Sequence, residues 1–159
     1  MARTFKLPCT SEARYKLNMK QALNPKSGPK PIGPYNQAIK VGDFLFCSGQ
    51  IPINPNTGQL VEGDIQVQTT QVIENIKSIL QSAGLNLENV VKTTVYMTDL
   101  TEFPAMNEVY AKYFGPVYPA RTTVQVDDLP RGAKIEIDVI AHFSSTPSVS
   151  NLTSPTVKS

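Results

Sequence analysis

The chain has 159 residues, of which 40% are hydrophobic and 18% charged, and its formal net charge is +2 at pH 7. This length predicts one folded domain with tails, and no apolar run approaches the roughly 20 residues of a membrane span. Two cysteines, Cys9 and Cys47, are too few for a disulfide framework. His142 is the only histidine, and no residues have the spacing of a metal site, so we predict no metal ion. Because no apolar run is long enough to span a bilayer, we also predict no membrane partner.

The charge is divided unevenly along the chain. Residues 1–29 contain six Lys or Arg against Glu12, whereas residues 30–143 contain eight Lys or Arg against twelve Asp or Glu. Because phosphate backbones select basic faces, the acidic part argues against a nucleic-acid partner. The first 29 residues are basic and acid-poor, as in a mitochondrial transit segment, although Pro8 would interrupt a helix; a flexible arm is the alternative. The expected compartment is the mitochondrial matrix or the cytoplasm.

The first half of the fold is expected to begin near residue 32 and to contain a hairpin, with strands at 35–40 and 44–51. A brief edge strand is expected at 59–61. Asp64 can cap the following helix, whose apolar residues recur with helical spacing. Gly84 ends this helix with a left-handed conformation.

The second half contains another helix and three strands. Residues 89–98 are rich in β-branched side chains, which predicts a central strand. The helix after it tolerates Pro104 in its first turn and ends at Gly115. Strands at 121–126 and 134–142 follow, joined by a short turn that contains Pro and Gly.

The order of elements predicts an α+β fold with a mixed sheet, because helices between strands imply crossovers and short turns imply hairpins. Two helices can cover only one face of the sheet. The other face is lined by Val, Ile and Phe, so we expect a symmetric oligomer. The domain should span residues 30–143. Residues 144–159 are rich in Ser, Thr and Pro and are expected to form a disordered tail.

Two side chains in the last strands stand out as candidates for chemistry. Arg121 carries a planar fork that matches a small carboxylic acid; the alternative is an arginine paired with an acid of its own chain. Glu136 lies between two isoleucines and could hold a water or exchange a proton; the alternative is a solvated strand face. Tyr35 could form an aromatic wall, and Gly49, next to Ser48, would let the backbone approach a ligand.

Several short motifs are recognisable together: Gly33-Pro34-Tyr35, Ser48-Gly49-Gln50-Ile51-Pro52, Val91-Lys92-Thr93-Thr94-Val95-Tyr96, Asn107, Pro119-Ala120-Arg121 and Ile135-Glu136-Ile137. They resemble the Rid (YjgF/UK-type) family, and are most similar to its RidA branch of imine and enamine deaminases. The resemblance covers about residues 30–143.

This resemblance implies a chorismate-mutase-like α+β fold and a homotrimer with a central β-barrel, helices outside and three clefts between subunits. It also implies hydrolysis of reactive 2-imino or 2-enamino acids, such as 2-aminoacrylate, to 2-keto acids and ammonia, an activity of the 2-iminobutanoate/2-iminopropanoate deaminase type. An imine is already electrophilic, so no cofactor is required.

The resemblance also implies roles for individual residues. Arg121 would bind the substrate carboxylate, and Glu136 would orient or activate the water. The backbone of Thr123 would add a hydrogen bond, although many relatives have cysteine at this position. The cleft would further be lined by Tyr35, Ser48, Gly49, Phe103 and Asn107.

Two other functions are compatible with the same resemblance. Some relatives are described as endoribonucleases that inhibit translation, and others would be non-catalytic keto-acid binders or chaperone-like trimers. The acidic central part argues against RNA as a partner. The presence of Arg121 favours the deaminase over a non-catalytic trimer, since some family branches lack that arginine.

Overall fold

The computed structural model describes residues 19–26, 28–31 and 33–143. The predicted transit segment or arm falls largely on residues 1–18, and the predicted tail is residues 144–159. Residues 1–18 and 144–159 lie outside the described residues, so the predictions on them and on the compartment stay predictions. None of the helices in the described part of the chain has the length and hydropathy needed to cross a bilayer.

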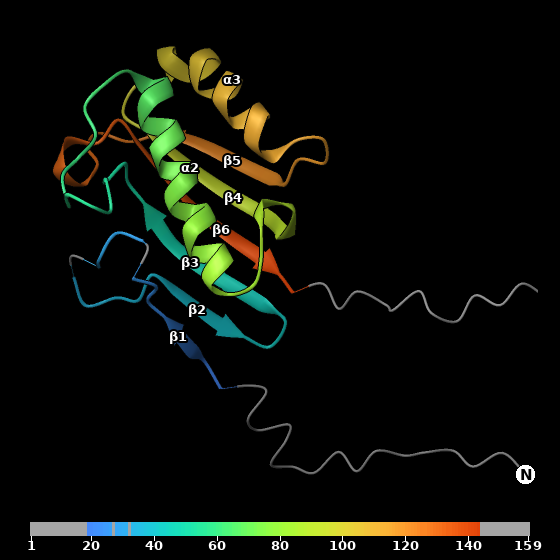
Figure 1. Cartoon of the computed structure of the whole chain (residues 1–159). Coiled ribbons are helices and arrows are strands. Elements are labelled where there is room, and N and C mark those ends of the chain that lie inside the picture. Colours follow the sequence, from blue (N-terminus) through green and yellow to red (C-terminus); the bar gives the residue numbers. More distant parts are fainter. Residues whose placement is uncertain (1–18, 27, 32, 144–159) are drawn as a thin grey trace, which may run out of the picture.

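One six-stranded mixed sheet forms the centre of the fold, with strand order β1-β2-β3-β6-β4-β5 (Figure 1). Strands β4 and β5 are parallel, and all other neighbours are antiparallel. The strands are β1 (Gln21–Leu23), β2 (Ala38–Val41), β3 (Phe44–Gln50), β4 (Val90–Met97), β5 (Ala120–Gln125) and β6 (Ile135–His142). The predicted mixed sheet is confirmed.

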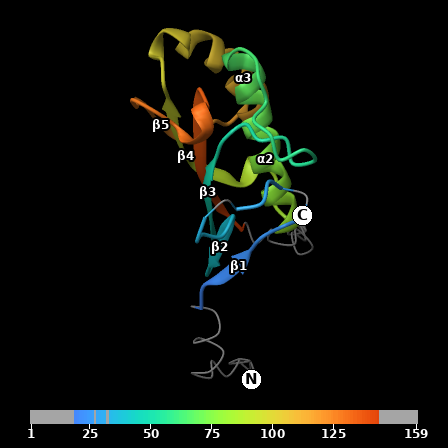
Figure 2. The same ribbon diagram turned by 90° about the vertical axis from the view of Figure 1, so that its left-hand side faces the viewer.

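Two α-helices lie on the same face of this sheet, α2 (Ile65–Ser82) and α3 (Phe103–Phe114) (Figures 1 and 2). Asp64 caps α2 as predicted, because its side chain accepts a hydrogen bond of 2.9 Å from the Val67 amide. Gly84 follows the helix with a φ of +75°, a conformation that costs a glycine little. Local chemistry therefore determines both ends of α2.

The core lies between the two helices and the sheet. Side chains alternate along β6, so that Ile135, Ile137 and Val139 are buried beneath the helices while Glu136 and Asp138 face the other way. Burying one such aliphatic side chain contributes roughly 1.5–3 kcal/mol. The largest fully buried members of the core include Leu45, Ile73, Ile76, Ile79, Leu80 and Met97.

The predicted hairpin between the last two strands is wrong. Strand β4 lies between β5 and β6 and pairs with both, so β5 is an edge strand. The connection from β5 to β6 passes the end of β4, where the Val126 amide donates to the Met97 carbonyl at 2.9 Å and the Thr98 amide donates to the Lys134 carbonyl at 3.1 Å. The Pro and Gly that suggested a hairpin turn therefore belong to a short loop. This loop passes the end of β4 and joins two strands that are not neighbours in the sheet.

Two smaller differences concern the first half of the chain. The fold begins earlier than residue 32, because β1 pairs with β2 in the register Gln21↔Lys40. The expected strand at 59–61 is reduced to a single bridge between Ile53 and Leu60. Neither difference was visible in the local pattern, since both depend on pairing with distant residues.

The helices of residues 19–143, as far as the structure describes them, leave the second face of the sheet uncovered (Figure 2). Phe44 and Phe46 of β3 are 42% and 45% exposed on it. Large aromatic side chains left this open mark a surface that another molecule can cover.

Candidate functional site

Arg121 lies at the start of β5 and points toward α3. One of its terminal nitrogens, Nη1, donates a hydrogen bond of 2.7 Å to Oδ1 of Asn107. The guanidinium carbon lies 4.6 Å from the centre of the Tyr110 ring and 5.4 Å from that of Phe103. Both distances are typical of cation–π contacts, so two rings and one amide hold the guanidinium in place.

Tyr110 is itself firmly held. Its ring stacks on Phe114 with 4.4 Å between the ring centres, and its hydroxyl lies 2.8 Å from the hydroxyl of buried Thr93. Burial raises the pKa of Tyr110, against smaller lowering effects from Thr93 and Arg121. The phenol therefore stays neutral beside the guanidinium, and the ring face remains available to the cation.

The Arg121 side chain opens into a pocket of about 350 Å³. Its walls are formed by Asn107, Tyr110, Ala111, Tyr118, Pro119 and Arg121. Within the described residues the ion pairs are Lys77–Glu74 and Lys134–Glu102, and neither involves Arg121. The alternative of an arginine paired with an acid is therefore not met in this part of the chain. We call this group of residues the Arg121 half-site.

Glu136 is the second residue of β6 and borders a second pocket, of about 250 Å³. This pocket is lined by Tyr35, Ser48, Gly49, Ile51, Pro130 and Glu136, which we call the Glu136 half-site. A Cβ atom at Gly49 would overlap the Glu136 carboxylate, so only glycine leaves room for it. The Ser48 hydroxyl donates to the Asn36 carbonyl at 2.7 Å, which ties the strand to the loop that carries Tyr35.

The surroundings of Glu136 favour its protonated form. Burial raises the pKa of Glu136, and the negative charge of Asp138 raises it further. Asp138 accepts a hydrogen bond of 3.3 Å from the Tyr96 hydroxyl. Lys134 pairs with Glu102 at 2.9 Å. The alternative for this residue was a side chain on a solvated strand face. Glu136 is instead half-buried, and its pKa is raised.

Arg121 and Glu136 are not brought together within one chain. Thr93 of β4 has Arg121 as its partner on one side and Val139 on the other, and Thr93 and Val139 are buried beneath the helices. Glu136 pairs with Tyr96 and points to the uncovered face. The two half-sites therefore lie on opposite faces of the same sheet, because residues that differ in register by an odd number face opposite ways.

The eight residues expected at the site divide between these two groups. Tyr35, Ser48 and Gly49 lie with Glu136, while Phe103 and Asn107 lie with Arg121. Thr123 lies one pleat beyond Arg121 on the same face of β5, and its buried hydroxyl oxygen has no hydrogen-bond partner within the described residues. The roles assigned to these residues stay predictions.

Sequence reasoning missed several walls of the pockets. Tyr110 was not among the expected site residues, although it lies three residues after Asn107 and so on the same side of the helix. Tyr118 was not expected at the site either, and Pro119 was named only as part of the motif that ends in Arg121. In the described part of the chain, no group of three or more His, Cys, Asp or Glu side chains is placed to hold a metal ion.

Comparisons with known proteins agree on this region. A family model described as Endoribonuclease L-PSP matches residues 25–143, which include both half-sites. A RutC family protein of Pyrococcus horikoshii is 56% identical over 124 residues, or 78% of this chain and 98% of that protein. The structure of E. coli TdcF with bound serine is 41% identical, with a TM-score of 0.75, over 78% of this chain and 99% of that one. RidA from an Antarctic Psychrobacter species is 43% identical, with a TM-score of 0.74, over 77% and 98%.

Proposed function

This chain belongs to the endoribonuclease L-PSP family, and from that premise we propose that it hydrolyses 2-imino and 2-enamino acids to 2-keto acids and ammonia. The observation that carries the proposal is the Arg121 half-site, a guanidinium held between rings with no acidic partner in the described residues. Similarity to a protein named RidA and to TdcF with bound serine, an amino acid with a free carboxylate, supports the same ligand class.

Arg121 is the carboxylate anchor in this proposal. Asn107 engages Nη1, which leaves further N–H donors of the fork for a ligand. A planar carboxylate accepts two parallel hydrogen bonds from such a fork. Because the rings of Tyr110 and Phe103 restrict the guanidinium, little side-chain entropy is lost when the ligand binds.

Glu136 handles the water. Its raised pKa makes the carboxylate a better proton acceptor than an ordinary glutamate. It accepts a proton as water attacks the C=N carbon and passes that proton to the nitrogen, giving a tetrahedral carbinolamine. The hydroxyl proton of the carbinolamine is then transferred to the amino nitrogen as the C=O bond forms and the C–N bond breaks, and ammonia and the 2-keto acid leave. An enamine enters the same route after protonation at carbon.

The complete site requires more than one copy of the chain. Arg121 and Glu136 face opposite sides of one sheet, so a substrate of a few atoms cannot touch both in a single chain. We propose a homotrimer in which Arg121 of one copy faces Glu136 of the next. The exposed Phe44 and Phe46 support this arrangement, because a neighbouring copy would remove them from water.

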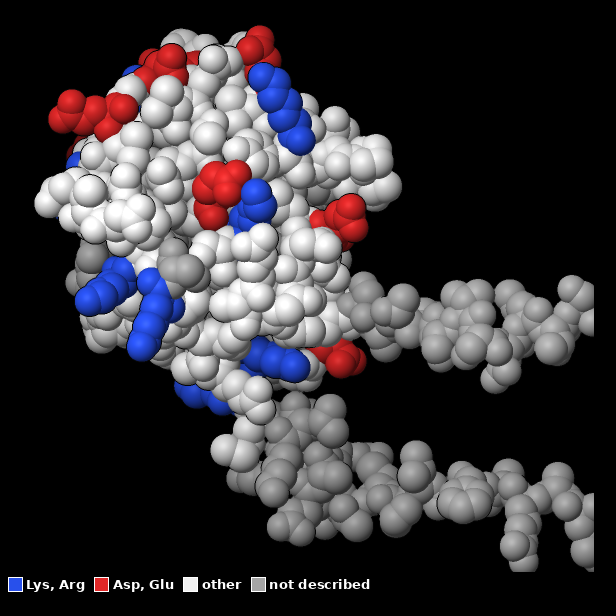
Figure 3. Space-filling view, in the orientation of Figure 1, with Lys and Arg blue, Asp and Glu red and all other residues white. Residues whose placement is uncertain are grey.

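RNA cleavage is the competing function, and the description of the matched family favours it. The charge distribution argues against it. On the face shown in Figure 3, Lys and Arg occur singly or in small groups separated by uncharged surface, without a continuous basic strip. Binding to a phosphate backbone depends on such a strip. A non-catalytic keto-acid binder would use the Arg121 half-site alone.

A coupled assay tests the proposal. An amino-acid oxidase generates 2-imino acids, and semicarbazide traps whatever survives. The purified protein should suppress trapping, and Arg121→Ala should reduce kcat/KM by about a hundredfold, since each hydrogen bond to a charged group contributes ~1.5–3 kcal/mol. Lys112→Ala, an exposed cation near the end of α3, serves as the matched control and should behave as the wild-type protein.

Glu136→Gln separates catalysis from binding. It should lower turnover while keto-acid affinity, measured by calorimetry, changes little. If Glu136→Gln abolishes both turnover and keto-acid affinity, Glu136 acts in binding the ligand instead. If wild-type protein does not suppress trapping at all, the deaminase proposal is wrong, and cleavage of single-stranded RNA becomes the next assay.

A further inference from the structure

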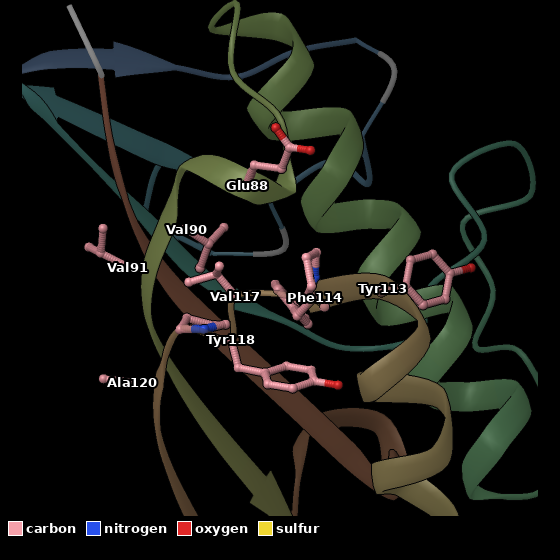
Figure 4. Close-up of a pocket in the computed structure, with 11 residues that line it drawn as sticks. Glu88, Val90, Val91, Tyr113, Phe114, Val117, Tyr118 and Ala120 are labelled. Atoms are coloured by element: carbon pink, nitrogen blue, oxygen red, sulfur yellow. The ribbon is translucent and has the colours of Figure 1, made fainter.

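A cavity that is lined by neither Arg121 nor Glu136 lies beside the Arg121 half-site. It has a volume of about 590 Å³, larger than either half-site pocket, and lies where the end of α3, the start of β4 and the loop before β5 meet (Figure 4). Val90, Phe114, Pro116 and Val117 form much of its wall. These side chains offer dispersion contacts and no hydrogen bonds, so the cavity suits an apolar group.

Tyr118 separates this cavity from the Arg121 half-site. Tyr118 and Pro119 line both spaces. In Figure 4 the Tyr118 ring extends from the loop toward α3. Its hydroxyl reaches Gly115, where an added Cβ atom would lie 3.3 Å from it. The ring is therefore a wall with one space on either side.

The Tyr118 wall can move without disturbing the core. Its side chain is 57% exposed, and the neighbouring Val117 is 86% exposed. Exposed side chains change rotamer on the picosecond to nanosecond timescale. The core contacts of α3 come instead from Met106, Val109, Tyr110 and Phe114, which are buried.

We propose that Tyr118 determines substrate size, and that the cavity behind it receives the apolar side chain of the larger 2-imino acids. This inference rests on the proposed deaminase function. In a 2-imino acid the carboxylate and the side chain are attached to the same C=N carbon. Anchoring the carboxylate at Arg121 therefore leaves the side chain within a few bonds of the shared wall.

The far end of the cavity restricts the substrate class further. Glu88 lies there, with Val90, Val117 and Phe114 between it and Tyr118 (Figure 4). Its carboxylate would repel a second carboxylate on the substrate side chain. Neutral branched or aromatic side chains are thus the expected occupants, and acidic ones are excluded.

The test compares two imines in the semicarbazide assay. One D-amino-acid oxidase makes both of them, one from D-alanine and the other from D-leucine. Tyr118→Ala opens the wall and should raise the leucine-to-alanine ratio of kcat/KM by about tenfold, since one methylene in an apolar pocket changes discrimination by ~10–200-fold. Tyr118→Phe keeps the ring and should leave the ratio unchanged. Val117→Trp fills the cavity from an exposed position and should lower the ratio.

The outcomes distinguish this inference from the function on which it rests. If wild-type protein fails on the alanine-derived imine, the deaminase proposal is wrong. If wild-type protein hydrolyses that imine but the ratio stays the same in both Tyr118→Ala and Val117→Trp, the cavity does not receive the side chain. If Tyr118→Ala does not fold, as judged by circular dichroism, Val117→Trp decides alone.

Discussion

Two inactive variants are expected to regain activity when their subunits mix. Arg121→Ala removes the carboxylate anchor, and Glu136→Gln removes the proton acceptor. The two side chains lie on opposite faces of one sheet, with Arg121 beside buried Thr93 and Glu136 beside Tyr96. In the proposed trimer each site therefore takes one of them from each of two neighbouring copies.

The expected recovery follows from this geometry. In a random equal mixture, half of the copies retain Arg121 and half of their neighbours retain Glu136, so about a quarter of the sites are intact. If both side chains instead served a site within one chain, every chain would carry a lesion and no site would recover. The mixture should be made by co-expression, and turnover should be measured with the semicarbazide assay.

A second mixture provides the matched control. The double variant Arg121→Ala/Glu136→Gln combined with wild-type protein should retain about a quarter of the sites in the shared arrangement, but about half if each chain holds a complete site. Native mass spectrometry confirms that mixed oligomers have formed. Mixed oligomers of the two single variants without turnover would refute the shared site.

Two further predictions concern the Glu136 half-site. Gly49→Ala should lower turnover by about a hundredfold with little change in the thermal midpoint. The added Cβ displaces the Glu136 carboxylate, and a misplacement of ~1 Å has about that effect on rate. Unchanged turnover would show that catalysis does not need the Glu136 carboxylate at this position. Asp138→Asn should move the acid limb of the kcat/KM profile to lower pH. Glu136 acts in its ionised form, so activity is lost as the pH falls through the pKa of Glu136. Removing the negative charge of Asp138 lowers that pKa, while Lys134 stays paired with Glu102. An unmoved limb would contradict this account of Glu136.

The local elements of this protein were readable from the sequence because each depends on residues that are close in the chain. Asp64 and Gly84 mark the ends of α2 through a side-chain cap and a left-handed turn. The alternation of Ile135, Glu136 and Ile137 placed the glutamate away from the core before any partner strand was known.

The chemistry of the site was also partly visible in the sequence. Arg121 and Glu136 were recognised as unusual side chains for strands, and their neighbours in short motifs suggested a family. The family model that matches residues 25–143 agrees with that resemblance at the level of the family. The deaminase activity, the trimer and the residue roles remain proposals, because they depend on contacts beyond one chain.

Strand order and the direction of side chains across strands were decided only by the tertiary structure. A short turn between β5 and β6 suggested a hairpin, but β4 gains partners on both sides by lying between them. The support of Arg121 by Tyr110, the space for Glu136 beside Gly49 and the wall at Tyr118 all join segments far apart in sequence. Local propensity acts over a few residues, whereas register and packing are set by the whole core, which is why these features required the folded chain.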